Sequence, residues 1–167
     1  MDIGEKTREN LGTAFAGESQ ANRKYLAFAK QTDSVGHHQA ARLFRAAAES
    51  ETIHALKHLS FLGGIGDTNA NLTAATAGED YEYTEMYPAF MADAAADGDD
   101  AVAAYIKFVS KVEEEHSALY REMTESLGNA EDAAYYVCGY CGHVHVGAAP
   151  EKCPVCGAPK SQFREII

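Results

Sequence analysis

All four cysteines of the chain lie near its C-terminal end, in two Cys-x-x-Cys pairs. The first 137 residues contain no cysteine and nothing at the N-terminus resembles an export signal, so disulfides are not expected. Four thiolates at this spacing predict a tetrahedral metal site, and the donor set alone fits zinc as well as iron. We expect the residues around such a site to fold only with the metal. The predicted ligands are Cys138, Cys141, Cys153 and Cys156.

A second group of side chains combines carboxylates and imidazoles at helical spacing. Glu51 precedes His54 by three residues, which places both side chains on one face of a helix. Glu113 and His116 repeat this Glu-x-x-His spacing. Glu18 lies on an apolar stripe, where a buried carboxylate is costly unless it is paired or binds a metal. These donors predict a cage for two metal ions, and their mixed chemistry favours iron or manganese. Two further carboxylates of the same kind are Glu79 and Glu82.

The hydrophobic pattern predicts an all-α domain followed by a small metal-binding module. Apolar residues recur at steps of three and four, and glycines stand where these stretches end. The segment 65–77 is rich in Gly, Asn and Thr, and we interpret it as a long crossover. We therefore predict a four-helix bundle with one long crossover over residues 1–132 and a metal module over residues 133–167. The helices are expected at residues 5–33, 37–62, 78–97 and 99–127.

Composition and charge exclude several classes of function. The chain has 167 residues, 46% of them hydrophobic, and a formal charge of -11 at neutral pH. This composition suits one globular domain with a small appendage. An acidic chain repels phosphate groups, so nonspecific binding to nucleic acids or to anionic membranes is disfavoured. No apolar run has the length of a membrane span, and we expect a cytoplasmic location.

Three parts of the chain resemble the rubrerythrin family. They are residues 15–21 (FAGESQA), residues 78–88 (GEDYEYTEMYP) and the pair of Cys-x-x-Cys motifs. The resemblance extends over nearly the whole chain, in the family's order of helical bundle first and rubredoxin-like module second. It implies a ferritin-like fold, a di-iron site in the bundle and one iron at the four cysteines, although zinc can occupy such thiolates in preparations.

By this resemblance, particular side chains bind the two irons. Glu82 would be the additional carboxylate of the family's third helix, and one iron would exchange it for His54 when the cluster is reduced. Tyr25 and Tyr87 match positions whose phenols hydrogen-bond the ligand carboxylates. The implied di-iron ligands are Glu18, Glu51, His54, Glu79, Glu82, Glu113 and His116.

The implied activity is that of a non-haem peroxidase that reduces hydrogen peroxide to water in oxidative-stress defence. Electrons would reach the di-iron site through the four-cysteine iron, from a rubredoxin or an NADH-linked reductase. The family's dimers, in which electrons are thought to pass between subunits, imply a head-to-tail homodimer. Two other functions stay open: a ferroxidase or oxidase that uses dioxygen in iron handling, and a zinc-ribbon interaction protein without redox chemistry.

Other residues near the cysteines are expected to have structural roles. His143 and His145 stand between the two Cys-x-x-Cys motifs, and we expect them to be loop residues rather than ligands. Aromatic side chains are expected to pack around the thiolates and exclude water from them. These are Tyr135, Tyr136, Tyr140 and Phe163.

Overall fold

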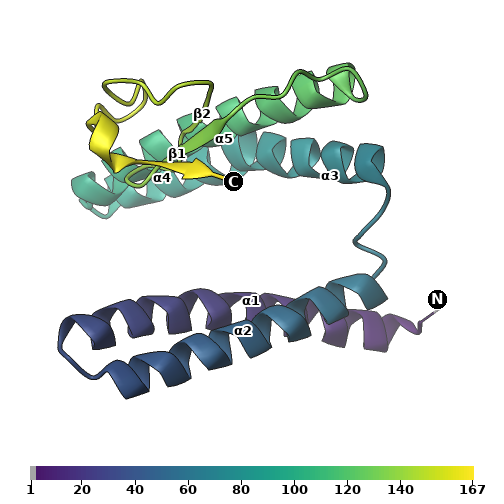
Figure 1. Cartoon of the computed structure of the whole chain (residues 1–167). Helices are drawn as coiled ribbons and strands as arrows, with labels where there is room; N and C mark the ends of the chain where they lie inside the picture. Colours follow the sequence, from purple (N-terminus) through teal and green to yellow (C-terminus); the bar gives the residue numbers. More distant parts are fainter. Residues whose placement is uncertain (1–2) are drawn as a thin grey trace. The chain divides into compact units, whose positions relative to one another are not determined.

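The computed structural model describes residues 3–167 and shows a mostly helical chain with a small C-terminal sheet (Figure 1). The chain divides into two compact units, one ending at Gly66 and the other beginning at Asp67. Four long helical stretches and a cysteine module are present, which confirms the predicted fold class. The helices are α1 (Glu5–Ser34), α2 (His38–Phe61), α3 (Thr68–Tyr81), α4 (Tyr87–Ala96) and α5 (Asp100–Ser126), with a π-helical turn, η1 (Glu82–Met86), between α3 and α4.

The first unit is a hairpin in which α1 and α2 lie side by side in opposite directions (Figure 1). Its seam is lined by small side chains, because Ala41, Ala48 and Ala55 recur every seven residues on α2 and are buried. Asn22 of α1 crosses the seam and donates from Nδ2 to the Ala48 carbonyl and to Thr52 Oγ1, each at 2.7 Å. The two helices are therefore joined by close packing and by one buried amide.

The third helical stretch begins at Thr68, so the predicted crossover over residues 65–77 and the predicted start at residue 78 are wrong. Asp67 caps the helix, since its Oδ1 accepts the N–H of Ala70 at 2.8 Å. The polar residues that suggested a loop fit the helix because two threonine hydroxyls donate to carbonyls one turn earlier. The connection from α2 is consequently short, residues 62–67.

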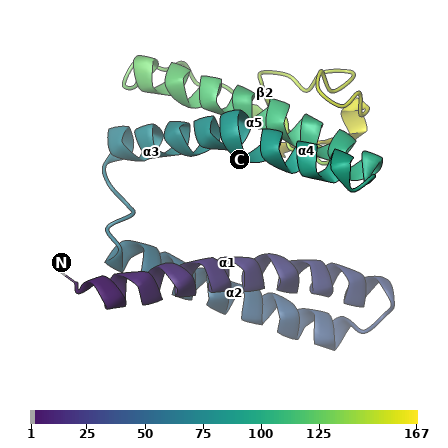
Figure 2. The same ribbon diagram turned by 180° about the vertical axis from the view of Figure 1, so that it is seen from behind.

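One turn of this stretch is wider than an α-helix. In η1 the N–H of Tyr87 bonds the carbonyl of Glu82, five residues earlier. Pro88 follows at once; it has no N–H, and in a regular helix its ring would clash with the carbonyl four residues before it. The wide turn relieves this conflict, and the stretch continues as α4. Helix α5 packs against both α3 and α4 and runs in the opposite direction (Figures 1 and 2).

The C-terminal module is a three-stranded antiparallel sheet in the order β2-β1-β3, and β2 contacts α5. Its cysteines cluster with two apolar side chains of α5, Val112 and Phe108. Of the aromatic residues expected around the thiolates, Phe163 packs there, whereas Tyr140 is 59% exposed because α5 supplies the cover instead. The elements are β1 (Tyr135–Cys138), β2 (Val144–Val146), the 3-10 helix η2 (Lys160–Gln162) and β3 (Phe163–Ile166).

No helix within residues 3–167 is both long enough and apolar enough to cross a membrane.

Candidate metal centres

The first unit holds a cluster of three predicted ligands, which we call the first half-site. Glu18 of α1 lies beside Glu51 and His54 of α2, and each can place one ligand atom within 4.8 Å of the others. The Nδ1 atom of His54 lies 3.1 Å from Glu51 Oε2 and 3.9 Å from Glu18 Oε1. The three-residue spacing of the pair on α2 turns both side chains toward α1. One metal ion could bind between the two helices.

Two carboxyl groups of the first half-site interact with each other. The hydrogen bond between them raises the pKa of Glu18, and burial and the charge of Glu51 act in the same direction. The same bond, together with His54, lowers the pKa of Glu51. The charge of His58 opposes the rise at Glu18, so this histidine also lies near the cluster. A metal ion that binds here requires both carboxyl groups to be ionised and must displace any proton that Glu18 holds.

The second unit holds a matching cluster, the second half-site. Glu79 of α3 lies beside Glu113 and His116 of α5, and their ligand atoms also fall within 4.8 Å of one another. The Nδ1 atom of His116 lies 2.8 Å from Glu113 Oε2 and 4.0 Å from Glu79 Oε1. The side chain of His116 is 22% exposed, whereas that of His54 is 51% exposed. The second half-site is therefore the more enclosed of the two.

Burial and neighbouring charges raise the pKa values of two groups in the second half-site. Burial, followed by the charge of Glu113, raises the pKa of Glu79 to about 7. The hydrogen bond to Glu113 raises the pKa of His116. At neutral pH the metal-free cluster can thus hold protons on both a carboxyl group and the imidazole, and a metal ion must replace them.

Glu82 and the two predicted tyrosines have different surroundings. Burial and the charge of Glu113 raise the pKa of Glu82, so this carboxyl faces the second half-site without being one of its three clustered donors. Burial, then the charges of Glu82 and Glu113, raises the pKa of Tyr87, so its phenol lies close to these carboxylates. Tyr25 packs its ring against two phenylalanines of the first unit, with centroid distances of 6.3 Å to each.

A polar bridge that sequence analysis did not predict lies next to the second half-site. The buried hydroxyl of Ser117 donates to Asp80 Oδ1 at 2.6 Å and accepts from Arg121 Nη1 at 2.9 Å. The guanidinium of Arg121 also pairs with Asp80, so the three side chains close a ring between α3 and α5. Because Asp80 follows Glu79 and Ser117 follows His116, this ring fixes the register of the two ligand-bearing helices.

The four predicted cysteine ligands come together in the module. Sγ of Cys138 lies 3.8 Å from that of Cys156, and Sγ of Cys141 lies 3.6 Å from that of Cys153. A tetrahedron with metal–sulfur bonds of about 2.3 Å has edges of about 3.8 Å, so these sulfurs fit a single ion. Although burial opposes it, backbone N–H groups after Cys138 lower the pKa of that thiol, which favours the thiolate that a metal requires.

The loop after Cys141 contacts α5, and this corrects the expectation that His143 is an ordinary loop residue. Its side chain is 8% exposed, and Nδ1 lies 2.5 Å from Glu115 Oε2. The preceding carbonyl, that of Gly142, faces the ring of His116 and contributes to the raised pKa of this imidazole. The sequence hides this contact because Glu115 and His143 are far apart along the chain.

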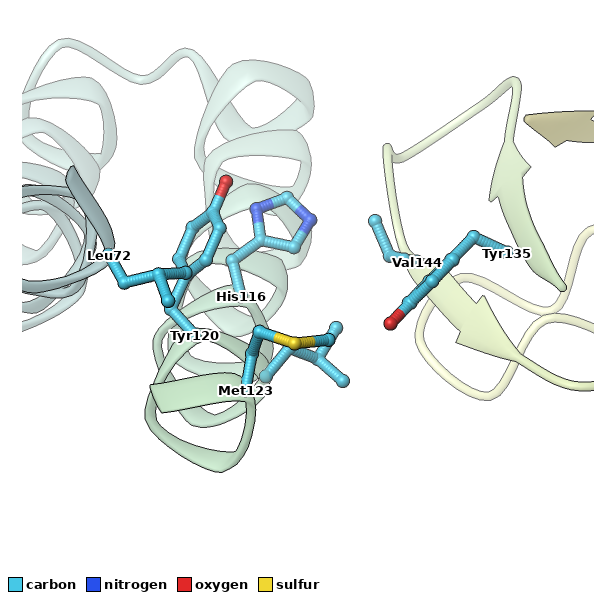
Figure 3. A pocket seen from close by; sticks show the side chains of 7 residues that line it. Leu72, His116, Tyr120, Met123, Tyr135 and Val144 are labelled. Carbon is cyan, nitrogen blue, oxygen red and sulfur yellow. The ribbon is translucent and has the colours of Figure 1, made fainter. Parts of the chain in front are cut away.

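A mostly apolar cavity of about 300 Å³ lies between α5 and the module. His116, Tyr120 and Met123 of α5 face Tyr135 and Val144 of the module across it (Figure 3). His116 therefore belongs both to the second half-site and to the lining of this cavity.

Comparison with known proteins decides the family. A model described as rubrerythrin matches residues 9–124, and one described as the rubredoxin-like domain of rubrerythrin matches residues 136–164. The chain belongs to the rubrerythrin family. A rubrerythrin of Nitratidesulfovibrio vulgaris is 37% identical to it, over 96% of this chain and 94% of the relative. Nigerythrin of the same organism is 33% identical, over 94% of this chain and 85% of the relative.

Solved structures agree with this family. A structure of nigerythrin in the fully reduced, all-ferrous state matches with a TM-score of 0.59 and 32% identity, over 99% of this chain and 89% of that chain. Another, of nigerythrin in a partially reduced state, matches with a TM-score of 0.58 at the same identity. The predicted combination of a ferritin-like helical fold and a rubredoxin-like module is therefore confirmed.

Membership identifies the cofactors and the general activity. Rubrerythrins carry a di-iron site and a rubredoxin-like four-cysteine iron, and both donor sets occur in this chain. The family comprises di-iron oxidoreductases of oxidative-stress defence, which accept electrons from rubredoxin-type partners and are often dimeric. The geometry fits these metals, because the thiolate spacing matches one tetrahedral ion and each half-site offers two carboxylates and one imidazole.

Proposed function

We propose that this member of the rubrerythrin family is a peroxidase that reduces hydrogen peroxide to water, with electrons delivered through the four-cysteine iron. The observation that carries the proposal is the placement of two different metal-binding chemistries on one helix. Helix α5 contributes Glu113 and His116 to the second half-site, and Val112 of the same helix packs among the cysteines. A one-electron thiolate site beside a carboxylate–imidazole site suits an enzyme that must supply two electrons to an O–O bond.

We further propose that the two half-sites and Glu82 supply the ligands of the di-iron pair. The carboxylate and imidazole donors support this, and so does the raised pKa of Glu82 next to Glu113. Tyr25 and Tyr87 are proposed to hydrogen-bond ligand carboxylates, and for Tyr87 the support is its closeness to Glu82. The domains are proposed to be residues 1–132 and 133–167, in keeping with the two family-model matches.

The bound irons would supply the electrons and the Lewis acidity for cleavage of the O–O bond. Each peroxide takes up two electrons and two protons and leaves as two waters. The chain's own groups manage the protons and the water. In the metal-free cluster the pKa of Glu79 is raised to about 7 by burial, so iron binding there would release a proton. Val112, Phe108 and Phe163 cover the cysteines and exclude water from them.

The proposal extends to partners and location. We propose that a rubredoxin or an NADH-linked reductase reduces the four-cysteine iron and that the protein works as a cytoplasmic homodimer. The exposed Tyr140 supports the first part, because it lies within the first Cys-x-x-Cys motif and leaves that side of the cysteine loop accessible to a donor protein.

Anaerobic stopped-flow mixing tests the activity. Fully reduced, iron-loaded protein is mixed with peroxide and separately with dioxygen, and the visible charge-transfer band of the thiolate iron is followed. We expect fast return of the band with peroxide and slow return with dioxygen. A faster reaction with dioxygen would replace the peroxidase with an oxidase or ferroxidase. Absence of the band would mean that the cysteines hold zinc, as in an interaction module.

A second experiment tests the ligand assignment. We expect crystals of the diferric and the diferrous protein to differ at one iron, with Glu82 as its ligand in the oxidised state and His54 in the reduced state. Identical ligation in the two states would contradict this part of the proposal.

A further inference from the structure

Each half-site lies on a helix face that continues into an exposed apolar side chain. Leu43 stands eleven residues, or about three helical turns, before His54, and it is 70% exposed. Tyr105 stands eleven residues before His116, and it is 48% exposed. These equal offsets place both residues close to the directions of the two histidine ligands. In each unit, the face that carries the ligands therefore offers apolar surface to a partner.

The first unit has no large apolar side chain in its interior. Over residues 3–66, the buried side chains are those of Asn22 and of four alanines. Larger apolar residues are about half exposed, among them Phe28 at 47% and Leu56 at 54%. A folded domain needs an apolar core between packed layers. This pair of helices must therefore be covered by other helices.

The family's fold sets the direction of the third helical stretch. A ferritin-like bundle has one long crossover, so its second and third helices run parallel. Glu51 lies ten residues before the end of α2, and Glu79 lies eleven residues after the start of α3. At a rise of about 1.5 Å per residue, ligands at one level place the end of α2 and the start of α3 about 32 Å apart along the bundle axis.

The connection between these two helices is too short for that distance. Seven Cα–Cα steps lead from Phe61 to Thr68, and they reach about 25 Å at full extension. The first part is not extended, because the N–H of Gly64 bonds the Leu59 carbonyl at 3.0 Å. The last part is fixed by Asp67, which caps α3. One chain therefore does not reach far enough to bring its own two half-sites to one level in a ferritin-like bundle.

We propose that the di-iron site forms between two copies of this chain, which exchange their helix pairs. The first unit of one protomer packs on the second unit of its partner, so each iron pair takes ligands from both chains. The short connection then has only to cross between two neighbouring bundles at one end. Such an exchange of identical elements is a low-cost route to a dimer, and short hinge segments favour it. The inference rests on the proposed ligand assignment, in which both half-sites serve one iron pair.

Complementation between two defective full-length chains tests the exchange. One chain carries Glu51→Ala with His54→Ala, the other carries Glu113→Ala with His116→Ala, and two affinity tags allow the co-refolded heterodimer to be isolated. An exchanged heterodimer has one bundle with both defects and one bundle with neither. We expect it to recover about half of the wild-type diferric absorption and iron content per dimer. Dimers in which both chains carry the same defect are the matched control and should recover almost none.

Absence of recovery in the folded heterodimer would overturn the proposal. The readout is the absorption of the iron pair, so it needs no peroxide. If wild-type protein forms this absorption but does not reduce peroxide, the proposed function fails, while complementation still decides the exchange.

Sedimentation of the metal-free chain tests the role of the connection. An insertion of about twelve Gly and Ser residues between Ile65 and Gly66 keeps both helix ends and adds about 40 Å of reach. The chain's own second unit then competes at an effective concentration of about 1 mM, so we expect mostly monomer at micromolar concentration. This monomer should still form the diferric absorption when loaded. The same insertion between Glu131 and Asp132 is the control and should stay dimeric. A monomeric wild type, or a dimer that the longer connection leaves unchanged, would overturn the proposal.

Discussion

The two half-sites use the same three residue types on two helices, yet their surroundings differ. The first half-site lies in a hairpin with an alanine seam, and its histidine is half exposed. The second half-site is enclosed by η1, α5 and the cysteine module, and its imidazole faces the Gly142 carbonyl. Identical donor types can therefore stand in surroundings of different exposure. The side chain of His54 has more open space around it than that of His116.

The largest expected effects come from removing one carboxylate from each half-site, and they should differ between the two half-sites. Glu113→Ala removes the partner of His116 and the charge that acts on Glu79, Glu82 and Tyr87. We expect peroxide turnover and iron retention to fall by more than about a hundredfold, beyond the usual effect of a residue that only supports a ligand. Glu51→Ala should cost less, since water can replace a donor at the more exposed cluster. Metal analysis and turnover measure both, and equal losses would contradict the difference.

The buried polar residue beside each half-site gives a smaller, structural comparison. Asn22→Ala removes one buried and one partly buried hydrogen bond to α2 and leaves a cavity in the hairpin seam, so we expect a loss of about 2 to 3 kcal/mol of unfolding free energy. Ser117→Ala leaves Asp80 paired with Arg121 and should cost about 1 kcal/mol. Urea unfolding of the metal-free protein measures both. Thr13→Ala, exposed on α1, is the control.

The residue that caps α3 allows a smaller test of whether the two units are stabilised independently. Asp67→Ala removes the acceptor for the Ala70 N–H, and we expect a loss of about 1 kcal/mol, with Asp67→Asn close to wild type. Hydrogen exchange should increase over the first turn of α3 and stay unchanged in α1 and α2. Increased exchange in the first unit would show that the cap stabilises more than its own helix.

The smallest expected effect is the contribution of Glu79, in the second half-site, to the pH dependence of stability. The pKa of Glu79 is raised from 4.5 to about 7, so the folded metal-free protein binds more protons than the unfolded chain between these values. Its stability should therefore fall as pH rises from about 4.5 through about 7, and solvent screening keeps this change small. Glu79→Gln should flatten the profile. In the first half-site, the pKa of Glu18 is raised and that of Glu51 is lowered, so the two carboxyl groups affect stability in opposite directions as pH changes.

Regular spacing explains what the sequence could predict. The Glu-x-x-His pairs and the Cys-x-x-Cys pairs indicate their clusters because each pair is local, and helical period or a tight turn brings its members together. The start of α3 was missed because Asn and Thr favour loops on average, while one capping aspartate was enough to begin a helix. The bond between His143 and Glu115 was missed because the two residues lie far apart in the sequence. Neither residue belongs to a local motif whose spacing would have indicated the contact.

The π turn at Glu82–Met86 also limits which insertions and deletions this helical stretch can tolerate. An α-helix rotates by about 100° per residue, so the extra residue of the wide turn sets a fixed angular phase between α3 and α4. Deleting one residue of this turn would restore regular bonding but rotate everything beyond Tyr87 by that angle. It would also return Pro88 to a clash with the helix. Insertions and deletions here should therefore be tolerated only when a compensating change restores the phase.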